Sequence, residues 1–498
     1  MIHWIVLIPF IFNISSCGKK AEEIPTDQIL ARIDDRILTV DEFLQRAEYT
    51  IRPDYCSMDN YIHKKIVLNS LIGEKLLALE TNEETPLLKN EGFLAYIRGR
   101  KEQAMRQVLY EQDAYNQVEL DSAEIRTAFN VAGRVYNVSY FSLSDREKVK
   151  AVADSLESDK WTFNELYREI WGGEEPAARQ VRWEEKNHPA IERVLFMSAP
   201  EKDQVVGPVQ VDEENYIFMQ INGWTDSRVI TEQTMRQRLF DVKEKLTRNH
   251  AAHIWSDRVQ DIMKDKHLEF SEEIFWKMNE IFFNRYYITD KEKKDTFNRK
   301  FWQGKDVELT IEDFEDEAKI LNDPFFTIEG TIWTVKEFKE LLASHPLVFR
   351  DRKIPAEEFP KQFKLAVVDL IRDKYITDVA YEKKLDQHQS VQIITKMWED
   401  ALLAYYNKLQ YLDRITEGNK VDVASEGQVK RYMNPYIDSL QIKYTDRIEI
   451  NMDAFEKIRL THIDMYVTQR QMPYQTVVPS FPTVTTDNRL DYGRLMEK

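Results

Sequence analysis

Two stretches of this chain, far apart in the sequence, repeat one short pattern. Residues 32–43 read RIDDRILTVDEF and residues 327–338 read TIEGTIWTVKEF, with half of the positions identical. Each stretch predicts a strand, a tight turn and a second strand. Thr39 or Thr334 would then cap a helix, and a glutamate three residues later completes a capping box. The repeat therefore indicates two copies of one structural module.

Further matches follow each hairpin. Residues 71–77 (LIGEKLL) and 370–376 (LIRDKYI) lie in segments whose apolar residues recur at helical spacing, so both predict core-facing helices. Residues 268–271 (LEFS) and 448–451 (IEIN) each predict a short closing strand. Because an isolated hairpin is marginally stable, we expect each closing strand to pair with the hairpin of its own copy.

The first copy exceeds the second by about one small domain, and the excess lies near residues 130–230. Its pattern predicts a helix over 122–130 and then strands and helices in the order β-α-α-β-α-β, from a strand at 135–143 to a strand at 216–221. The sequence therefore predicts an inserted α+β domain within a mainly helical chain.

The order of these segments resembles the parvulin-type peptidyl-prolyl isomerases. In that family a helix contains FAELA, the last loop reads like GEVSGPV and the last strand like GYHIIKV. Here residues 163–166 (FNEL), 205–209 (VVGPV) and 215–219 (NYIFM) stand in those places. The two copies resemble the helical N-terminal chaperone module of SurA and PrsA, in which a VNGEPIT-EEF hairpin precedes a helix containing LIDEKLL. The resemblance covers most of residues 26–280 and returns over 326–458.

The parvulin resemblance implies a site with two histidines, but those positions read Ser139 and Ile217 here. Isomerisation must lower a barrier of ~18–20 kcal/mol, which requires oriented polar groups. We therefore expect isomerase activity to be weak or absent, and the resemblance implies no cofactor and no metal. What it does imply is binding of extended chain. The candidate substrate-binding residues are apolar: Phe141, Trp183, Ile191, Phe196 and Phe218.

The first residues predict an export signal. An apolar run over 4–14, too short to span a bilayer, leads into Ile14-Ser15-Ser16-Cys17. Small residues before a cysteine resemble the lipobox of bacterial lipoproteins, which implies a lipid on Cys17. We expect a signal peptide over 1–16 and a lipid anchor on the periplasmic side of the cell envelope, at the outer membrane. Cys56 then has no disulfide partner.

Composition excludes several classes of function. The 69 Lys and Arg against 86 Asp and Glu give a net charge of −17, which disfavours nucleic acid as a partner. The motifs GxxxxGK[ST], HExxH and GxSxG do not occur, so neither ATP nor common hydrolytic chemistry is indicated.

These patterns divide the chain into seven parts. They are a signal peptide (1–16), a SurA-like helical module (17–130), a parvulin-like domain (131–228), the helices and closing strand of the first module (229–280), a connector (281–325), a second module without an insert (326–466), and an extended tail with three prolines (467–498).

The leading interpretation is a chaperone that binds unfolded or partly folded exported proteins. One alternative is an active isomerase in which Ser139 and its neighbours replace the histidines. Another is a structural lipoprotein subunit of an envelope assembly that docks a partner through the tail.

Overall fold

The computed structural model describes residue 25 and the ranges 28–81, 85–158, 160–185, 187–211, 215–227, 231–286, 319–351, 354–417, 425–460 and 473–496. The predicted signal peptide, Cys17 and most of the predicted connector lie outside these ranges. The chain forms two compact units, Leu109–Ile262 and the remainder on either side of it. The fold is α+β and mainly helical, as predicted. None of the helices in the described ranges has the length and apolar composition of a membrane span.

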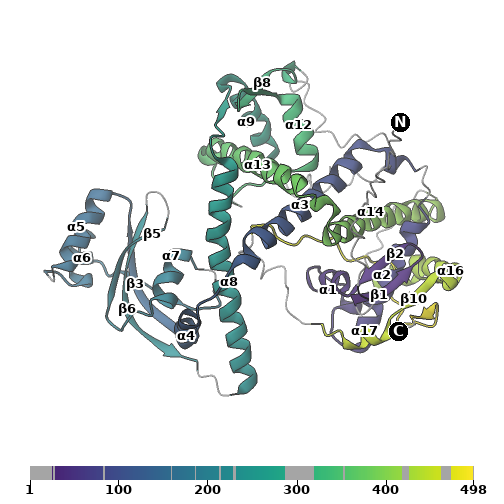
Figure 1. Cartoon of the computed structure of the whole chain (residues 1–498), viewed down its shortest axis with the longest axis horizontal. Coiled ribbons are helices and arrows are strands. Elements are labelled where there is room, and N and C mark those ends of the chain that lie inside the picture. The colour runs from purple at the N-terminus through teal and green to yellow at the C-terminus, as the bar shows by residue number, and fades with distance from the viewer. Residues whose placement is uncertain are drawn as a thin grey trace, which may run out of the picture. The chain divides into compact units, whose positions relative to one another are not determined.

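One module of the larger unit is built from both ends of the chain, and we call it the outer module. It brings together segments that lie hundreds of positions apart (Figure 1). Its elements are β1 (Ile29–Ile33), β2 (Arg36–Thr39), α1 (Val40–Glu48), α2 (Tyr61–Leu79), α14 (Gln389–Ile415), α16 (Asn434–Lys443), β10 (Ile448–Ile450), α17 (Met452–Lys457) and β11 (Arg494–Leu495). The strand order in its sheet is β11-β10-β1-β2.

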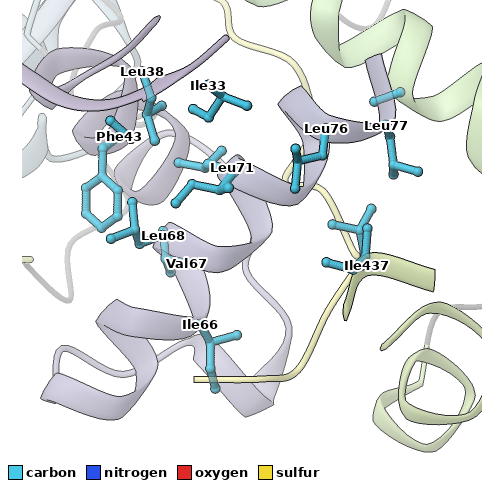
Figure 2. Close-up of a cluster of buried hydrophobic side chains, with 14 of the residues drawn as sticks. Ile33, Leu38, Phe43, Ile66, Val67, Leu68, Leu71, Leu76, Leu77 and Ile437 are labelled. Atoms are coloured by element: carbon cyan, nitrogen blue, oxygen red, sulfur yellow. The ribbon is translucent and has the colours of Figure 1, made fainter. Parts of the chain in front are cut away.

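Helix α2 is the centre of the outer module. Asn60 caps its first turn by accepting a hydrogen bond from the backbone N–H of His63 at 2.9 Å. Almost every residue from Ile66 to Ala78 is buried, because the hairpin, α14 and α16 surround the helix. Figure 2 shows Leu68 and Leu71 beside Leu38 and Phe43 of the N-terminal hairpin and helix.

A second module of the larger unit is continuous in sequence, and we call it the inner module. It consists of β7 (Leu268–Phe270), α9 (Glu272–Tyr286), β8 (Pro324–Ile328), β9 (Thr331–Thr334), α12 (Val335–Ser344) and α13 (Phe359–Glu382). Phenylalanine rings fill its core, among them Phe325, Phe338 and Phe363. Helix α3 (Glu91–Asp113) joins the two modules: Arg98 donates hydrogen bonds to Ser344 of α12, and Tyr96 packs on Trp398 of α14.

The expected pairing of the closing strands is wrong. Strand β10 pairs with β1 of the first hairpin, and β7 pairs with β8 of the second, both antiparallel. Each hairpin is thus completed by the strand that we assigned to the other copy. The physical reason lies in the helices: α14 and α16 pack on α2 and so deliver β10 to the first sheet, whereas α9 follows β7 directly and packs on α13.

The smaller unit contains one antiparallel sheet with the strand order β4-β3-β6-β5. Its elements are α4 (Ser122–Val131), β3 (Arg134–Leu143), α5 (Arg146–Glu157), α6 (Phe163–Ile170), β4 (Ala177–Val181), α7 (Pro189–Glu192), β5 (Val205–Gln210), β6 (Tyr216–Asp226) and α8 (Glu232–Met263). Helices α5 and α6 pack on one face, and α4 and α8 on the other. Residues 205–209, expected as a loop, form β5 against β6.

Candidate functional site

The two positions that the resemblance aligns with the parvulin histidines do not face each other. Ser139 on β3 lies opposite Gln220 of β6, and Ile217 of β6 lies opposite Ser142. Side chains alternate between the faces of a sheet, and directly opposed residues share a face, so Ser139 and Ile217 point to opposite faces. The Ser139 Oγ accepts a hydrogen bond of 2.8 Å from Asn222 Nδ2. These two positions therefore do not contribute to one site.

Four of the five apolar candidates fill two separate cores. Phe141 and Phe218 stack at 5.3 Å between ring centroids on the α5 and α6 side, with exposures of 4% and 0%. Trp183 and Phe196 meet edge to face at 5.4 Å on the other side, with exposures of 5% and 0%. Ile191 is partly buried against this second cluster. The sheet is therefore packed on both faces where we expected substrate to bind.

A different site appears where the predicted tail lies. Residues 473–489, which we call the C-terminal segment, contain no helix or strand and run along the outer module (Figure 1). The predicted extended tail is thus packed on the body over its described part. Trp398 Nε1 donates to the carbonyl oxygen of Val477 at 3.3 Å, and Lys408 Nζ donates to that of Thr483 at 2.8 Å.

Residues of the N-terminal half also donate to carbonyl groups of the segment, and two of them make the shortest of these contacts. An Arg46 guanidinium nitrogen lies 2.8 Å from the carbonyl oxygen of Ser480. Asn69 Nδ2 lies 2.7 Å from each of the carbonyl oxygens of Asp487 and Arg489. We call Arg46, Asn69, Trp398 and Lys408 the tail-binding surface. Their donors bind the backbone of the segment, a group that every polypeptide carries.

Several side chains of the segment are anchored as well, among them Tyr474, which is 7% exposed. Phe481 and Val484 join the core of the outer module, and Thr485 is fully buried. Val484 rests on α2 at Gly73, where an added Cβ would stand 3.1 Å from its Cγ2 atom. Backbone hydrogen bonds give affinity in such an arrangement, and a few side-chain pockets give register.

A buried ion network holds one part of the tail-binding surface in place. Arg46 forms a bidentate pair with Glu74, at 2.7 and 2.8 Å, while it also contacts the segment. Lys75 Nζ lies 2.8 Å from Glu42 and 3.2 Å from Asp400. Arg36 pairs with Asp400 at 2.5 Å. Three cations balance three carboxylates, and all six side chains are less than a tenth exposed.

The electrostatics of this network follow from its burial. Desolvation raises the pKa of Glu42, and the ion pair with Lys75 only partly opposes that rise. The ion pair with Lys75 is therefore the main contact that favours the charged form of Glu42 at this depth. This network was not predicted from the sequence. Glu74-Lys75 within a long apolar helix is nevertheless a signal of it, because a charged pair with apolar residues on both sides in the sequence has no solvated face.

Comparisons with known proteins say little about the family or function of this chain. No family model matches it, and no curated protein matches it. The chain is weakly similar to a solved structure, that of the foldase protein PrsA from Streptococcus pneumoniae. The two chains share 14% identity with a TM-score of 0.20, and the match covers 44% of this chain and 87% of that one. Function therefore has to be argued from the residues of this chain. Within the described ranges, His, Cys, Asp and Glu residues form no cluster able to hold a metal ion.

Proposed function

We propose that this protein is a foldase-like chaperone that holds extended segments of unfolded proteins without ATP. The observation that carries the proposal is the tail-binding surface, which holds a segment of the chain through its backbone carbonyl groups. Such contacts select an extended conformation rather than a sequence. Each hydrogen bond contributes only about 0.5–1.5 kcal/mol net, so a bound chain can leave without an energy source.

In this proposal the C-terminal segment and a client compete for one surface. The segment is tethered, so its effective concentration is in the range of ~mM, and a client must present several matching contacts to displace it. The segment then protects the apolar surface around Gly73 when no client is present.

A reversible lock tests this mechanism. In a Cys17→Ser background, Gly73→Cys with Val484→Cys places two thiols across the contact between α2 and the segment, and the second change removes the methyl group that an added Cβ would meet. The assay is suppression of aggregation of an unfolded client. We expect protection from the reduced variant and loss of protection after oxidation. Equal protection in both states would rule out the tail-binding surface, and no protection by the unmodified protein in excess would reject the chaperone function.

We further propose that the protein works in the cell envelope, anchored through Cys17. The support is the lipobox-like Ile14-Ser15-Ser16-Cys17 after an apolar run. Changing Cys17 to serine should move the protein from the membrane fraction to the soluble fraction. The opposed directions of Ser139 and Ile217 argue against isomerase activity, so we expect proline-limited refolding of a test protein to keep its rate.

A further inference from the structure

A groove in the larger unit carries more arginine than acid. It has a volume of about 490 Å³ and lies between α3, α13, residues 344–350 and the start of the C-terminal segment. Arg100, Arg106, Arg350 and Arg372 line it, against Asp369 and Asp373. We call it the arginine groove. An excess of positive charge at one place in a chain of net charge −17 indicates an anionic ligand.

The two aspartates are already engaged by two of the arginines. Asp369 accepts two hydrogen bonds from Arg350, at 2.8 and 2.9 Å, and one from Arg372 at 2.8 Å. Asp373 accepts from Arg372 at 2.8 Å, whereas Arg106 Nε lies 4.0 Å from it. These pairs consume both carboxylates and leave Arg100 and Arg106 without a full counter-ion.

Arg100 and Arg106 are held in place with donor capacity to spare. Arg100 lies over the rings of Tyr96 and Trp398, at 4.8 and 5.1 Å, and donates one hydrogen bond to Gln103 at 2.9 Å. Arg106, which is 6% exposed, donates to Thr377 at 2.8 Å. The Nε atoms of both arginines are buried and have no hydrogen-bond partner among the described residues. A guanidinium fixed in this way suits a planar carboxylate, which it can bind through two nitrogens.

Apolar side chains also line the groove. Val348 is 73% exposed, and Phe349, Leu370 and Tyr474 lie around the same space. An inorganic anion gains nothing from these apolar side chains, whereas a carboxylate next to an apolar side chain contacts both the arginines and the apolar lining. The tail residues Pro473, Tyr474 and Gln475 line one end, so the groove adjoins the path of a chain already held by this unit.

We propose that the arginine groove binds a carboxylate of a polypeptide, with the neighbouring apolar side chain against Val348 and Phe349. The groove proposal rests on the proposed function because it takes a polypeptide as the ligand. Binding in the groove, however, requires the C-terminal segment to stay bound to the body, because that segment forms part of the groove. Peptide binding in the groove should therefore survive the oxidised lock between positions 73 and 484, even where holding of an unfolded client is lost.

The test uses fluorescein-labelled Gly-Ser octapeptides and fluorescence anisotropy with the full chain. One peptide carries Phe-Asp and an amidated end, a second carries Phe-Asn in the same place, and a third ends in Phe with a free carboxylate. We expect a peptide with a carboxylate to bind about tenfold more tightly than the Phe-Asn peptide, and more weakly as salt is raised. Comparison of the first and third peptides identifies the source, a side chain or a chain end.

Arg350→Gln and Arg447→Gln form a matched pair of variants. Both arginines are about half exposed, at 51% and 52%, and each pairs with one aspartate, but only Arg350 lines the groove. We expect Arg350→Gln to weaken binding of the acidic peptide about fivefold, because Asp369 loses its bidentate partner and its charge then opposes the ligand, and we expect Arg447→Gln to leave binding unchanged. Equal binding of the Phe-Asp and Phe-Asn peptides would overturn the proposal, as would an equal loss in both variants or competition by inorganic phosphate with no binding of either acidic peptide.

Discussion

Replacing Lys75 by methionine removes the central cation of the buried ion network. Glu42 then loses its hydrogen-bonded partner at 2.8 Å, while Asp400 keeps Arg36. The network changes from neutral to one net negative charge in a region without solvent. Removal of one partner from a buried ion pair costs about 3–5 kcal/mol, and we expect a loss in that range. Since whole domains are stable by only ~5–15 kcal/mol, the outer module would be severely weakened.

Cys56 provides an assay for this module alone. Its side chain is fully buried in the core of the outer module, and burial raises the pKa of its thiol to about 12. In a Cys17→Ser background, the rate of labelling of Cys56 by a thiol reagent at increasing urea measures how often the outer module opens. Opening of the inner module or of the smaller unit leaves this signal unchanged.

Two controls make the prediction refutable. Lys374 occupies the position in α13 that matches Lys75, but it is partly exposed and pairs with Asp378, so Lys374→Met should cost less than about 1 kcal/mol. Adding Glu42→Leu to Lys75→Met removes both partners and should restore most of the loss. The reasoning fails if Lys75→Met costs no more than Lys374→Met, or if the double variant is no more stable than the single one.

Two further predictions concern the contact between α3 and the end of α12. A Cβ added at Gly99 would stand 1.9 Å from the carbonyl oxygen of Ser344, so Gly99→Ala should destabilise the larger unit by ~1–3 kcal/mol in urea unfolding, whereas Gly427→Ala, with open space around it, should not. Burial alone would raise the pKa of Glu102, but its hydrogen bonds, chiefly that with His345, lower it below the ordinary value of 4.5. A carboxyl group whose pKa is lower in the folded state stabilises the protein above pH ~4.5, and this stabilisation is lost as the pH falls through the lowered folded-state pKa. Glu102→Gln should therefore flatten the loss of thermal stability on acidification. An unchanged pH profile would contradict this.

Local patterns in the sequence predicted local structure correctly. Both hairpins form at the repeated motif, and Thr39 and Thr334 both cap the helices that follow. Of these two threonines, Thr334 has the full capping box, in which Glu337 returns to the cap, and Thr39 does not. In the first copy Glu42 binds Lys75 instead, because its side chain is buried against α2. Sequence spacing alone does not distinguish a solvated glutamate from a buried one.

Pairings between distant segments could not be predicted in the same way. The segments LEFS and IEIN have the same alternation, so neither carries information on which hairpin it completes. Which hairpin each segment completes depends on the packing of helices that lie far apart in the sequence. The arginines of the groove are likewise spread over α3, α13 and the loop between α12 and α13, and no local motif connects them. In the smaller unit the order of elements was predictable, but the filling of both sheet faces by the candidate aromatic residues was not.

The exchange of closing strands affects the order in which the parts of this protein can fold. The inner module and the smaller unit are each continuous in sequence, so each can form from local chain. The outer module needs β1 to α2 from one end and α14 to β11 from the other, and the closure of so long a loop is slow. Until both ends are present, the apolar side chains of α2 that pack on α14 and α16 have no cover. The ion network then favours one register, because Lys75 and Arg36 from the N-terminal half meet Asp400 from the C-terminal half with balanced charge. The C-terminal segment closes this module from the far end of the sequence, and under the proposed function a client would make the same backbone contacts in its place.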